Sequence, residues 1–269
     1  MRDDKFSGSA ALADHTVMLM GECDGWEPAR PVPECFENEL HVWRASLEVG
    51  ADRCSAFERL LDGPERRRAS RFRFARDREA FVASHGILRS ILGRYEHRRP
   101  ETLRFHYTVS GKPFIHSSEP GGVYQFNMSH TRNLVAVVVA RGRDVGIDVE
   151  QIRVDVTADD LSPLIRFAAD LYVGDPDTIT AGDARLFRLW ARTEAILKAS
   201  GTGLSADGLS FRSIESRRGA RGSSGAACWQ LWDFSPRAGC AGAVAVASAE
   251  GELRVRLFDY GVFQAYEGL

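Results

Sequence analysis

The chain has 269 residues, of which 44% are hydrophobic and 27% charged, and its formal net charge at pH 7 is −2. This composition allows a sizeable apolar core, and the charge argues against a surface built throughout for nucleic acid or an anionic membrane. The five cysteines form no Cys-x-x-Cys pair, so neither a disulfide framework nor a zinc site is expected. The apolar run 17–20 is too short for a signal peptide or membrane span. We therefore expect a soluble, cytoplasmic protein.

The first half of the chain combines an irregular lead-in with a strand, helices and short strands. Residues 1–36 show little periodicity and contain Pro and Gly breaks, so we expect no regular structure there. Residues 40–47 alternate apolar and polar side chains, as a half-buried strand does. From 64 to 95 apolar residues recur at helical spacing beneath an arginine-rich face, which predicts one amphipathic helix or a pair. Short strands are expected near 105–107, 123–126 and 134–140, the last buried on both faces.

The second half again mixes strands and helices. Residues 145–150 predict a strand, and helices are expected between about 158 and 200. Thr180 and Asp183 are candidate starts for the last helix, and Gly201 is a candidate C-cap. A loop rich in Gly, Ser and Arg is expected at 216–226. The remaining strands are expected at 209–214, 228–234, 241–249 and 253–258.

A faint echo relates the two halves, because residues 72–76 resemble residues 187–192 with a one-residue slip. So short a match is also consistent with chance. If it is real, it indicates two similar α+β halves joined near residue 144 and packed face to face. We accordingly divide the chain into an N-terminal half, residues 1–144, and a C-terminal half, residues 145–269.

Two carboxylates are held together in the strand predicted at 145–150. Alternate side chains of a strand share a face, so Asp148 and Glu150 project together while the apolar residues between them point into a core. Adjacent anions raise the electrostatic energy unless a cation neutralises them or one takes up a proton. Oxygen ligands suit a hard ion such as Mg²⁺, which also binds water and substrate phosphate. The solvent-facing edge of an amphipathic strand remains the alternative.

One helix face carries a third carboxylate and a cation. Trp190, Glu194 and Lys198 follow one another at four-residue spacing and therefore share a face. One interpretation is a surface ion pair between Glu194 and Lys198 over a core tryptophan. In the other, Glu194 is a further ligand of the ion and Lys198 meets phosphate oxygens, presented from a stiff helix opposite a stiff strand.

The order of these motifs along the chain resembles that of the Sfp-type 4′-phosphopantetheinyl transferases. The match spans roughly residues 40 to 250. Each block is short, but the ordered set is specific. The blocks are Phe72-Arg73-Phe74-Ala75-Arg76-Asp77, Gly111-Lys112-Pro113, Phe126-Asn127-Met128-Ser129-His130 and Gly146-Ile147-Asp148-Val149-Glu150, followed by Trp190-x-x-x-Glu194-x-x-x-Lys198 and Gly201-x-Gly203-Leu204.

The resemblance implies an α+β fold of two similar, pseudo-twofold-related subdomains, with coenzyme A in the cleft between them. It implies Mg²⁺, with Mn²⁺ as a substitute, bound by Asp148, Glu150 and Glu194. Many relatives carry Lys where this chain has Thr193, which puts a charge contact there in doubt but not the metal site. The coenzyme contacts that it implies are Arg68, Lys112, Ser129, His130, Asp148 and Lys198, with His130 at the 3′-phosphate and Lys198 at the pyrophosphate.

Each implied contact also has a simpler interpretation. His130 alone is consistent with a histidine bonded to a loop carbonyl, and Lys112 before Pro113 with turn chemistry. The register of Arg68 is uncertain because two further arginines precede it. Most of the arginine-rich face is expected to be solvated, with a subset facing the cleft.

The implied reaction is attack by a serine hydroxyl of an apo acyl or peptidyl carrier protein on the β-phosphorus of coenzyme A, releasing 3′,5′-ADP. Glu194 is the candidate base, accepting the proton directly or through a metal-bound water, and Lys198 is the cation that stabilises developing charge. The helix expected at 161–171 is a candidate docking surface for the carrier, although a core-facing helix fits equally well. We expect a monomer. A metal-dependent phosphohydrolase and a carrier-binding protein without catalysis are the alternatives, and the carrier's pathway stays open among fatty acid, polyketide, nonribosomal peptide and siderophore synthesis.

Overall fold

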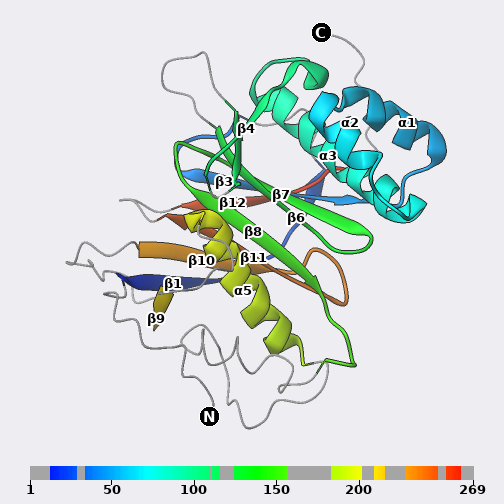
Figure 1. Ribbon diagram of the computed structural model, residues 1–269. Coiled ribbons are helices and arrows are strands. Elements are labelled where there is room, and N and C mark those ends of the chain that lie inside the picture. Colours follow the sequence, from blue (N-terminus) through cyan, green and yellow to red (C-terminus); the bar gives the residue numbers. More distant parts are fainter. Residues whose placement is uncertain are drawn as a thin grey trace, which may run out of the picture.

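The backbone forms two five-stranded mixed sheets, each with helix on its outer side (Figure 1). The computed structural model describes residues 13–28, 34–109, 111–115, 124–156, 183–201, 209–215, 228–247 and 253–261. The helix expected at 161–171 and the loop expected at 216–226 lie outside these residues, as does Thr180. Among the residues described, no helix combines the length and apolar character needed to cross a bilayer.

The first sheet has the strand order β2-β12-β3-β7-β6. Helix α3 (Ala75–Tyr95) covers its outer face, with α1 (Ala51–Leu60) and α2 (Gly63–Ala69) beside α3 (Figure 1). A short 3₁₀ turn, η1 (Pro100–Thr102), and the small hairpin of β4 (Phe105–Tyr107) and β5 (Pro113–Ile115) follow α3. The strands of the sheet are β2 (Glu27–Pro28), β3 (Glu39–Ser46), β6 (Tyr124–His130), β7 (Leu134–Arg141) and β12 (Arg254–Asp259).

The second sheet has the order β8-β11-β10-β1-β9, and α5 (Ala184–Ser200) packs on its outer face. Its strands are β1 (Ala13–Cys23), β8 (Val145–Gln151), β9 (Leu209–Glu215), β10 (Cys228–Phe234) and β11 (Cys240–Ala247). Listed from β6 and from β8, both sheets show two antiparallel pairings followed by two parallel ones. This shared pattern confirms the expectation of two similar α+β halves.

Three apolar layers hold these elements together. One lies between α3 and the first sheet and includes Trp43 and Phe126. The second lies between the two sheets, where Val138 of β7 and Ile147 of β8 are fully buried. The third lies between the second sheet and α5. Apolar burial, at about 25 cal/mol per Å², is the main stabilising contribution in such layers. Because the middle layer contains side chains from both sheets, it joins the two halves.

The expected strands at 40–47, 105–107, 134–140 and 145–150 are confirmed to within a residue or two, and every residue of β7 except its last is buried. The region 64–95 forms a pair of helices. Two elements differ from the expectation. Helix α1 was not predicted, and the lead-in was expected to lack structure, whereas Ala13–Cys23 forms an inner strand of the second sheet. Parallel pairing with β9 and β10, which only the fold supplies, stabilises this poorly patterned segment.

The boundary predicted between residues 144 and 145 falls in the turn between β7 and β8. Two strands, one near each end of the chain, join the sheet of the other half. The N-terminal β1 belongs to the sheet of the second half, and the C-terminal β12 pairs with β3 in the sheet of the first half.

Candidate active site

The candidate site lies where the edge strands of the two sheets meet, β6 from the first and β8 from the second. Both backbone groups of Ile147 point from the edge of β8 toward this junction. Its N–H donates to Oδ1 of Asn127 on β6 at 3.2 Å, and its carbonyl accepts from Nζ of Lys198 at 3.3 Å. Side chains thus satisfy an edge that would otherwise present free backbone groups.

Gly146 brings α5 into direct contact with β8. A Cβ at this position would lie 2.0 Å from the carbonyl oxygen of Ala195 and 2.4 Å from the amide nitrogen of Ala199. Only glycine permits so close an approach of helix to strand. Asp183 caps the start of α5 by accepting from the amide of Arg185, and Gly201 ends it in the left-handed conformation, as predicted. The helix is therefore fixed in position along the strand that carries the carboxylates.

Asp148 is more buried than Glu150 and Glu194. It is only 3% exposed, and its Oδ1 accepts from Nζ of Lys198 at 2.6 Å and from Oγ of Ser129 at 2.7 Å. Its Oδ2 is buried, and no residue that the structure describes gives it a hydrogen bond. A buried carboxylate oxygen without a partner is energetically costly, so this atom is a candidate ligand for a cation.

Glu150 and Glu194 lie in the electrostatic field of Asp148. Burial, together with the charges of Asp148 and Glu194, raises the pKa of the Glu150 carboxyl to about 7. Burial and the charge of Asp148 also raise the pKa of Glu194. The charge of Asp148 therefore disfavours ionisation of both glutamates, which is the condition that a bound cation relieves.

These residues fit a hard divalent cation by donor type and electrostatics. Within the described part of the chain, no three Asp, Glu, His or Cys side chains lie close enough to form a metal-binding group as they stand. The unpartnered Oδ2 of Asp148 and the carboxyl groups of Glu150 and Glu194 are oxygen donors of the kind that Mg²⁺ binds. The raised pKa values of the two glutamates show that their negative charges lack a fully neutralising partner among the described residues.

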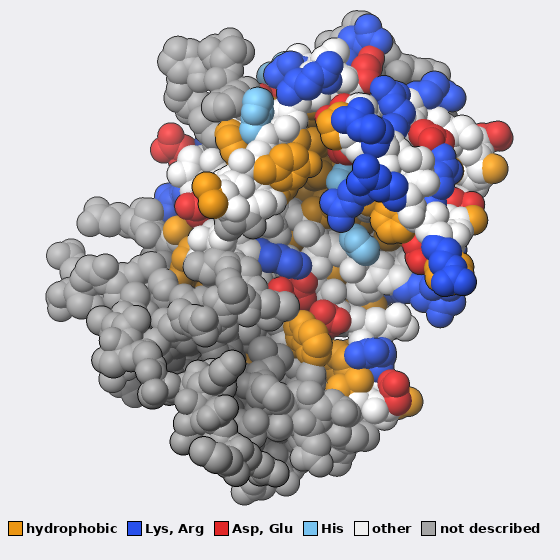
Figure 2. Space-filling view, in the orientation of Figure 1, with side chains coloured by type: hydrophobic (Ala, Val, Ile, Leu, Met, Phe, Trp, Pro, Cys, Tyr) orange, Lys and Arg blue, Asp and Glu red, His pale blue; other side chains and the backbone are white. Residues whose placement is uncertain are grey.

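Basic side chains from both halves lie near His130, next to the carboxylates. Burial lowers the pKa of His130, and electrostatic interactions with His85, Lys198 and Arg68 lower it further. A hydrogen bond with the backbone of Thr131 acts in the opposite direction and raises it. The three basic residues come from α3, α5 and α2. Figure 2 shows acidic side chains beside a basic one near the centre of the molecule, with Lys, Arg and His side chains gathered above them over α2 and α3.

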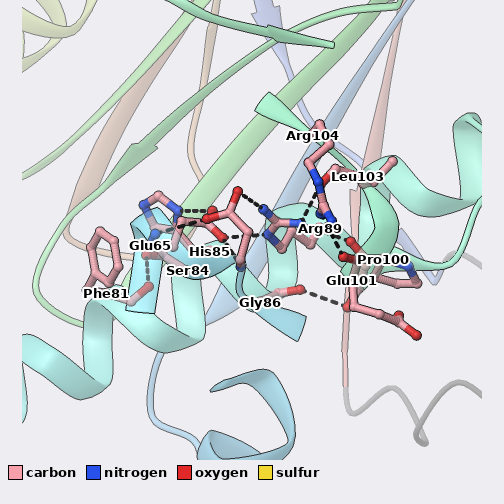
Figure 3. Close-up of polar contacts among 12 residues, drawn as sticks. Glu65, Phe81, Ser84, His85, Gly86, Arg89, Pro100, Glu101, Leu103 and Arg104 are labelled. Carbon is pink, nitrogen blue, oxygen red and sulfur yellow. Dashed lines mark hydrogen bonds and ion pairs between the residues drawn. The ribbon is translucent and has the colours of Figure 1, made fainter. Parts of the chain in front are cut away.

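A buried network centred on Glu65 holds α2 against α3 (Figure 3). Glu65 completes a capping box with Asp62 and accepts from Nδ1 of His85 at 2.9 Å and from Nε of Arg89 at 2.7 Å. Burial would raise the pKa of Glu65, but the hydrogen bond from His85 and the charge of Arg89 outweigh it and lower the pKa. Arg89 also donates to the carbonyl oxygens of Pro100 and Leu103.

The same network sets the position of Arg68. The guanidinium of Arg68 lies over the ring of Phe81, 5.3 Å from its centroid, and that ring in turn stacks on His85 with 4.0 Å between centroids. Arg68 and His85 are thus oriented by the fixed α2–α3 pair. No sequence motif predicted this network, because Glu65 is 20 residues from His85 and 24 from Arg89, and they meet only when the helices pack.

Lys112 links the hairpin of the first half to the second half. Its Nζ lies 2.9 Å from Oδ1 of Asp144 and 2.9 Å from the carbonyl oxygen of Ala199 near the end of α5. A cation is favourable at a helix C-terminus. The structure therefore brings Lys112 to the β7–β8 turn and to α5, next to the strand that carries Asp148.

Two further residues of the α5 motif face inward. Thr193 is fully buried and donates to the carbonyl oxygen of Leu189 at 2.8 Å. Arg192 forms a buried bidentate pair with Asp233 of β10, at 2.9 and 2.5 Å. This pair was missed in the sequence, where a lone arginine between Ala191 and Thr193 gives no sign of its distant partner. It fixes α5 to the second sheet on the helix side away from Lys198.

Comparison with known proteins gives two family matches along the chain. Residues 48–142 match the family model for 4′-phosphopantetheinyl transferase, N-terminal, and residues 144–245 match that for the 4′-phosphopantetheinyl transferase superfamily.

Individual relatives agree with the family models. The 4′-phosphopantetheinyl transferase HetI of Nostoc sp. is 33% identical over 82% of this chain and 93% of its own length. The 4′-phosphopantetheinyl transferase psf-1 of Bacillus pumilus is 30% identical over 52% of this chain and 58% of its own. The L-aminoadipate-semialdehyde dehydrogenase-phosphopantetheinyl transferase of Schizosaccharomyces pombe is 29% identical over 58% and 65%. The chain therefore belongs to the 4′-phosphopantetheinyl transferase superfamily, enzymes that use coenzyme A and transfer its phosphopantetheine to carrier proteins.

Proposed function

We propose that Asp148, Glu150 and Glu194 hold Mg²⁺, for which Mn²⁺ is an expected substitute, at the junction of β6 and β8, and that the pyrophosphate of coenzyme A binds there. The observation that carries this proposal is the buried, unpartnered Oδ2 of Asp148 beside two glutamates of raised pKa. When bound, the ion would neutralise the pyrophosphate and stabilise charge on the leaving oxygen. Asp148 thereby also borders the coenzyme.

Lys198 is the protein cation closest to this chemistry. Its ammonium group contacts Asp148, Ser129 and the carbonyl of Ile147, and the side chain is 28% exposed. A lysine held beside the carboxylates but open to solvent is placed to meet phosphate oxygens. Its role is to stabilise the negative charge that develops as the bond to the leaving group breaks.

The nucleotide end of the coenzyme would lie toward the first half. Arg68, His85 and Lys198 lie near His130 and add to the effect of burial in lowering its pKa. Such a group favours a dianion, so His130 and Arg68 are assigned to the 3′-phosphate. Lys112, which bridges the two halves at Asp144 and Ala199, is the further cation on the coenzyme's path.

The transfer step needs a base for the carrier serine. The serine oxygen forms a bond to the β-phosphorus, the bond from that phosphorus to the bridging oxygen breaks, and 3′,5′-ADP leaves with this oxygen. Glu194 accepts the serine proton. The substrate is an apo acyl or peptidyl carrier protein, and the enzyme acts as a cytoplasmic monomer.

A single assay separates this function from its alternatives. The protein is incubated with coenzyme A, Mg²⁺ and an apo carrier domain, and the carrier is weighed by mass spectrometry. A gain of one phosphopantetheine that stops with EDTA and returns with Mg²⁺ or Mn²⁺ supports the proposal. Free phosphate without carrier modification supports a phosphohydrolase. Carrier binding without mass gain, under conditions where a known transferase modifies the same carrier, supports a non-catalytic binding protein.

A further inference from the structure

The hydroxyl of Ser129 donates its only proton within the protein. A serine hydroxyl offers one proton and accepts through its lone pairs. Here it gives the proton to Oδ1 of Asp148 at 2.7 Å and accepts from Nζ of Lys198 at 3.2 Å. Ser129 is only 8% exposed. The resemblance assigns Ser129 to the coenzyme, but its proton is directed at the carboxylate instead.

The contacts of Asp148 divide sharply between its two oxygens. Oδ1 accepts two hydrogen bonds, from Ser129 and Lys198, whereas Oδ2 receives none from the described residues. Two donors on one oxygen hold the carboxylate in a single orientation. The other oxygen is then directed at whatever binds beside it.

Strand β6 contacts β8 through two of its side chains, those of Asn127 and Ser129. Asn127 and Ser129 lie on the same side of the strand because they are two residues apart. Asn127 anchors the edge of β8 at Ile147, and Ser129 reaches the next residue of β8, Asp148. The Asn-x-Ser pair therefore holds the two edge strands in register at the carboxylate.

We propose that Ser129 is a positioning residue of the metal site, which orients Asp148 so that Oδ2 faces the cation. This inference rests on the proposed metal site. Groups that orient a metal ligand typically change metal affinity 10- to 100-fold when removed. The role differs from that of the next residue, His130, which lies near His85, Lys198 and Arg68.

The test measures metal and coenzyme binding separately. Mn²⁺ affinity is determined by electron paramagnetic resonance without coenzyme, and coenzyme A affinity by calorimetry in EDTA. Ser129→Ala is expected to weaken Mn²⁺ binding about tenfold and to leave coenzyme binding within about twofold. Ser84→Ala, which removes another buried hydroxyl, bonded to the carbonyl of Phe81, is the matched control and is expected to change neither.

Two further variants keep the outcome interpretable. Ser129→Cys retains the shape of the side chain with a weaker donor and is expected to bind Mn²⁺ with an affinity between those of wild type and Ser129→Ala, so it carries the test if the alanine variant does not fold. Asp148→Asn reports on the metal site itself. Unchanged Mn²⁺ affinity in both Ser129 variants, with Asp148→Asn impaired, overturns the positioning role alone. Unchanged affinity in Asp148→Asn overturns this inference and the proposed metal site together.

Discussion

The edge strands β6 and β8 occupy equivalent positions in two sheets of the same pairing pattern, yet they carry opposite chemistry. β8 contributes the acidic groups Asp148 and Glu150, and β6 contributes the neutral polar side chains of Asn127 and Ser129 and the imidazole of His130. The helices follow the same division, because α5 adds Glu194 and α2 adds Arg68. A repeated scaffold thus carries carboxylates on one side of a junction and neutral or basic side chains on the other.

The difference teaches that similarity between the halves resides in the backbone, and function in what has diverged. A metal and a pyrophosphate need ligands of opposite charge within one site. Two identical edges would supply only one kind. The predictions below alter one side of the junction at a time, with a control that leaves the comparison intact.

The largest effect is expected from Asp148→Asn, on the acidic side. The change removes a charge from the proposed metal site and leaves Lys198 without its closest anion. Transfer to the carrier is expected to fall by about 10³-fold, the scale of losing a key electrostatic group. The measurement is the initial rate of carrier modification by mass spectrometry. Asp144→Asn is the control, since Asp144 is exposed and pairs with Lys112, and activity within about tenfold of wild type is expected.

Gly146→Ala and Gly86→Ala test whether the two halves tolerate crowding equally. A Cβ at 146 meets backbone atoms of α5, whereas one at 86 meets the side chain of Phe57 in α1. Gly146→Ala is expected to lower the free energy of unfolding by about 3 kcal/mol or more and to abolish transfer. Gly86→Ala is expected to lose about 1–3 kcal/mol, with Mn²⁺ binding retained. Urea unfolding with parallel Mn²⁺ titration checks both, and retained metal binding in Gly146→Ala would contradict the role of this contact.

Glu150→Gln tests how the carboxyl group of Glu150 makes the stability of the protein depend on pH. The pKa of Glu150 is raised to about 7, so folding favours its protonated form and stability is lost as pH rises from about 4.5 to 7. A shift of this size is worth about 3 kcal/mol for a fully buried group, and solvent screening reduces it to about 1–2 kcal/mol. In EDTA, wild type should lose this stability between pH 5 and 8 relative to Glu150→Gln.

Addition of Mg²⁺ supplies the second half of that test. If a cation replaces the proton, wild type should regain stability at pH 8 and the pH dependence should flatten. Glu150→Gln should gain less from Mg²⁺. Equal gains in the two proteins would show that Glu150 takes no part in binding the ion. Thermal unfolding at several pH values, with and without Mg²⁺, provides the measurement.

The smallest effect is expected on the basic side, from His130→Ala. Its loss should raise the KM for coenzyme A about tenfold, as removal of one charge-assisted contact does. Dephospho-coenzyme A, which lacks the 3′-phosphate, should show little difference between the variant and wild type. Because burial lowers the pKa of His130, its ring loses its charge at lower pH than a free histidine, so the KM of wild type should rise with pH more than that of the variant in the acidic range. Equal losses for both coenzymes would place His130 elsewhere.

Most of the second half of the site could be predicted from local sequence, because strand and helix periodicities place Asp148, Glu150 and Glu194 on defined faces. Strands β3, β7 and β8 followed from their alternation or β-branched content. What could not be predicted depends on distant partners. Strand β1 is stabilised by parallel neighbours more than 190 residues away, and Glu65 meets His85 and Arg89 only once two helices pack.

The short echo between residues 72–76 and 187–192 does not mark equivalent positions. Residues 72–74 precede α3 and only 75–76 begin it, whereas 187–192 lie inside α5. The halves resemble each other in strand pairing instead, which a comparison of short segments cannot detect. Ser129 illustrates the same limit, since its sequence context suggested the coenzyme and only the fold revealed its bond to Asp148.

The exchange of strands at the chain ends also constrains how the polypeptide folds during synthesis. The sheet built from the early part of the chain lacks its β12 strand until residues 254–259 leave the ribosome, while β1, made first, waits for β9 and β10. Contacts over such long separations in sequence slow folding. Neither half is therefore expected to be stable when expressed as a separate fragment, and mixing two fragments cut at the β7–β8 turn should restore structure only when both are present.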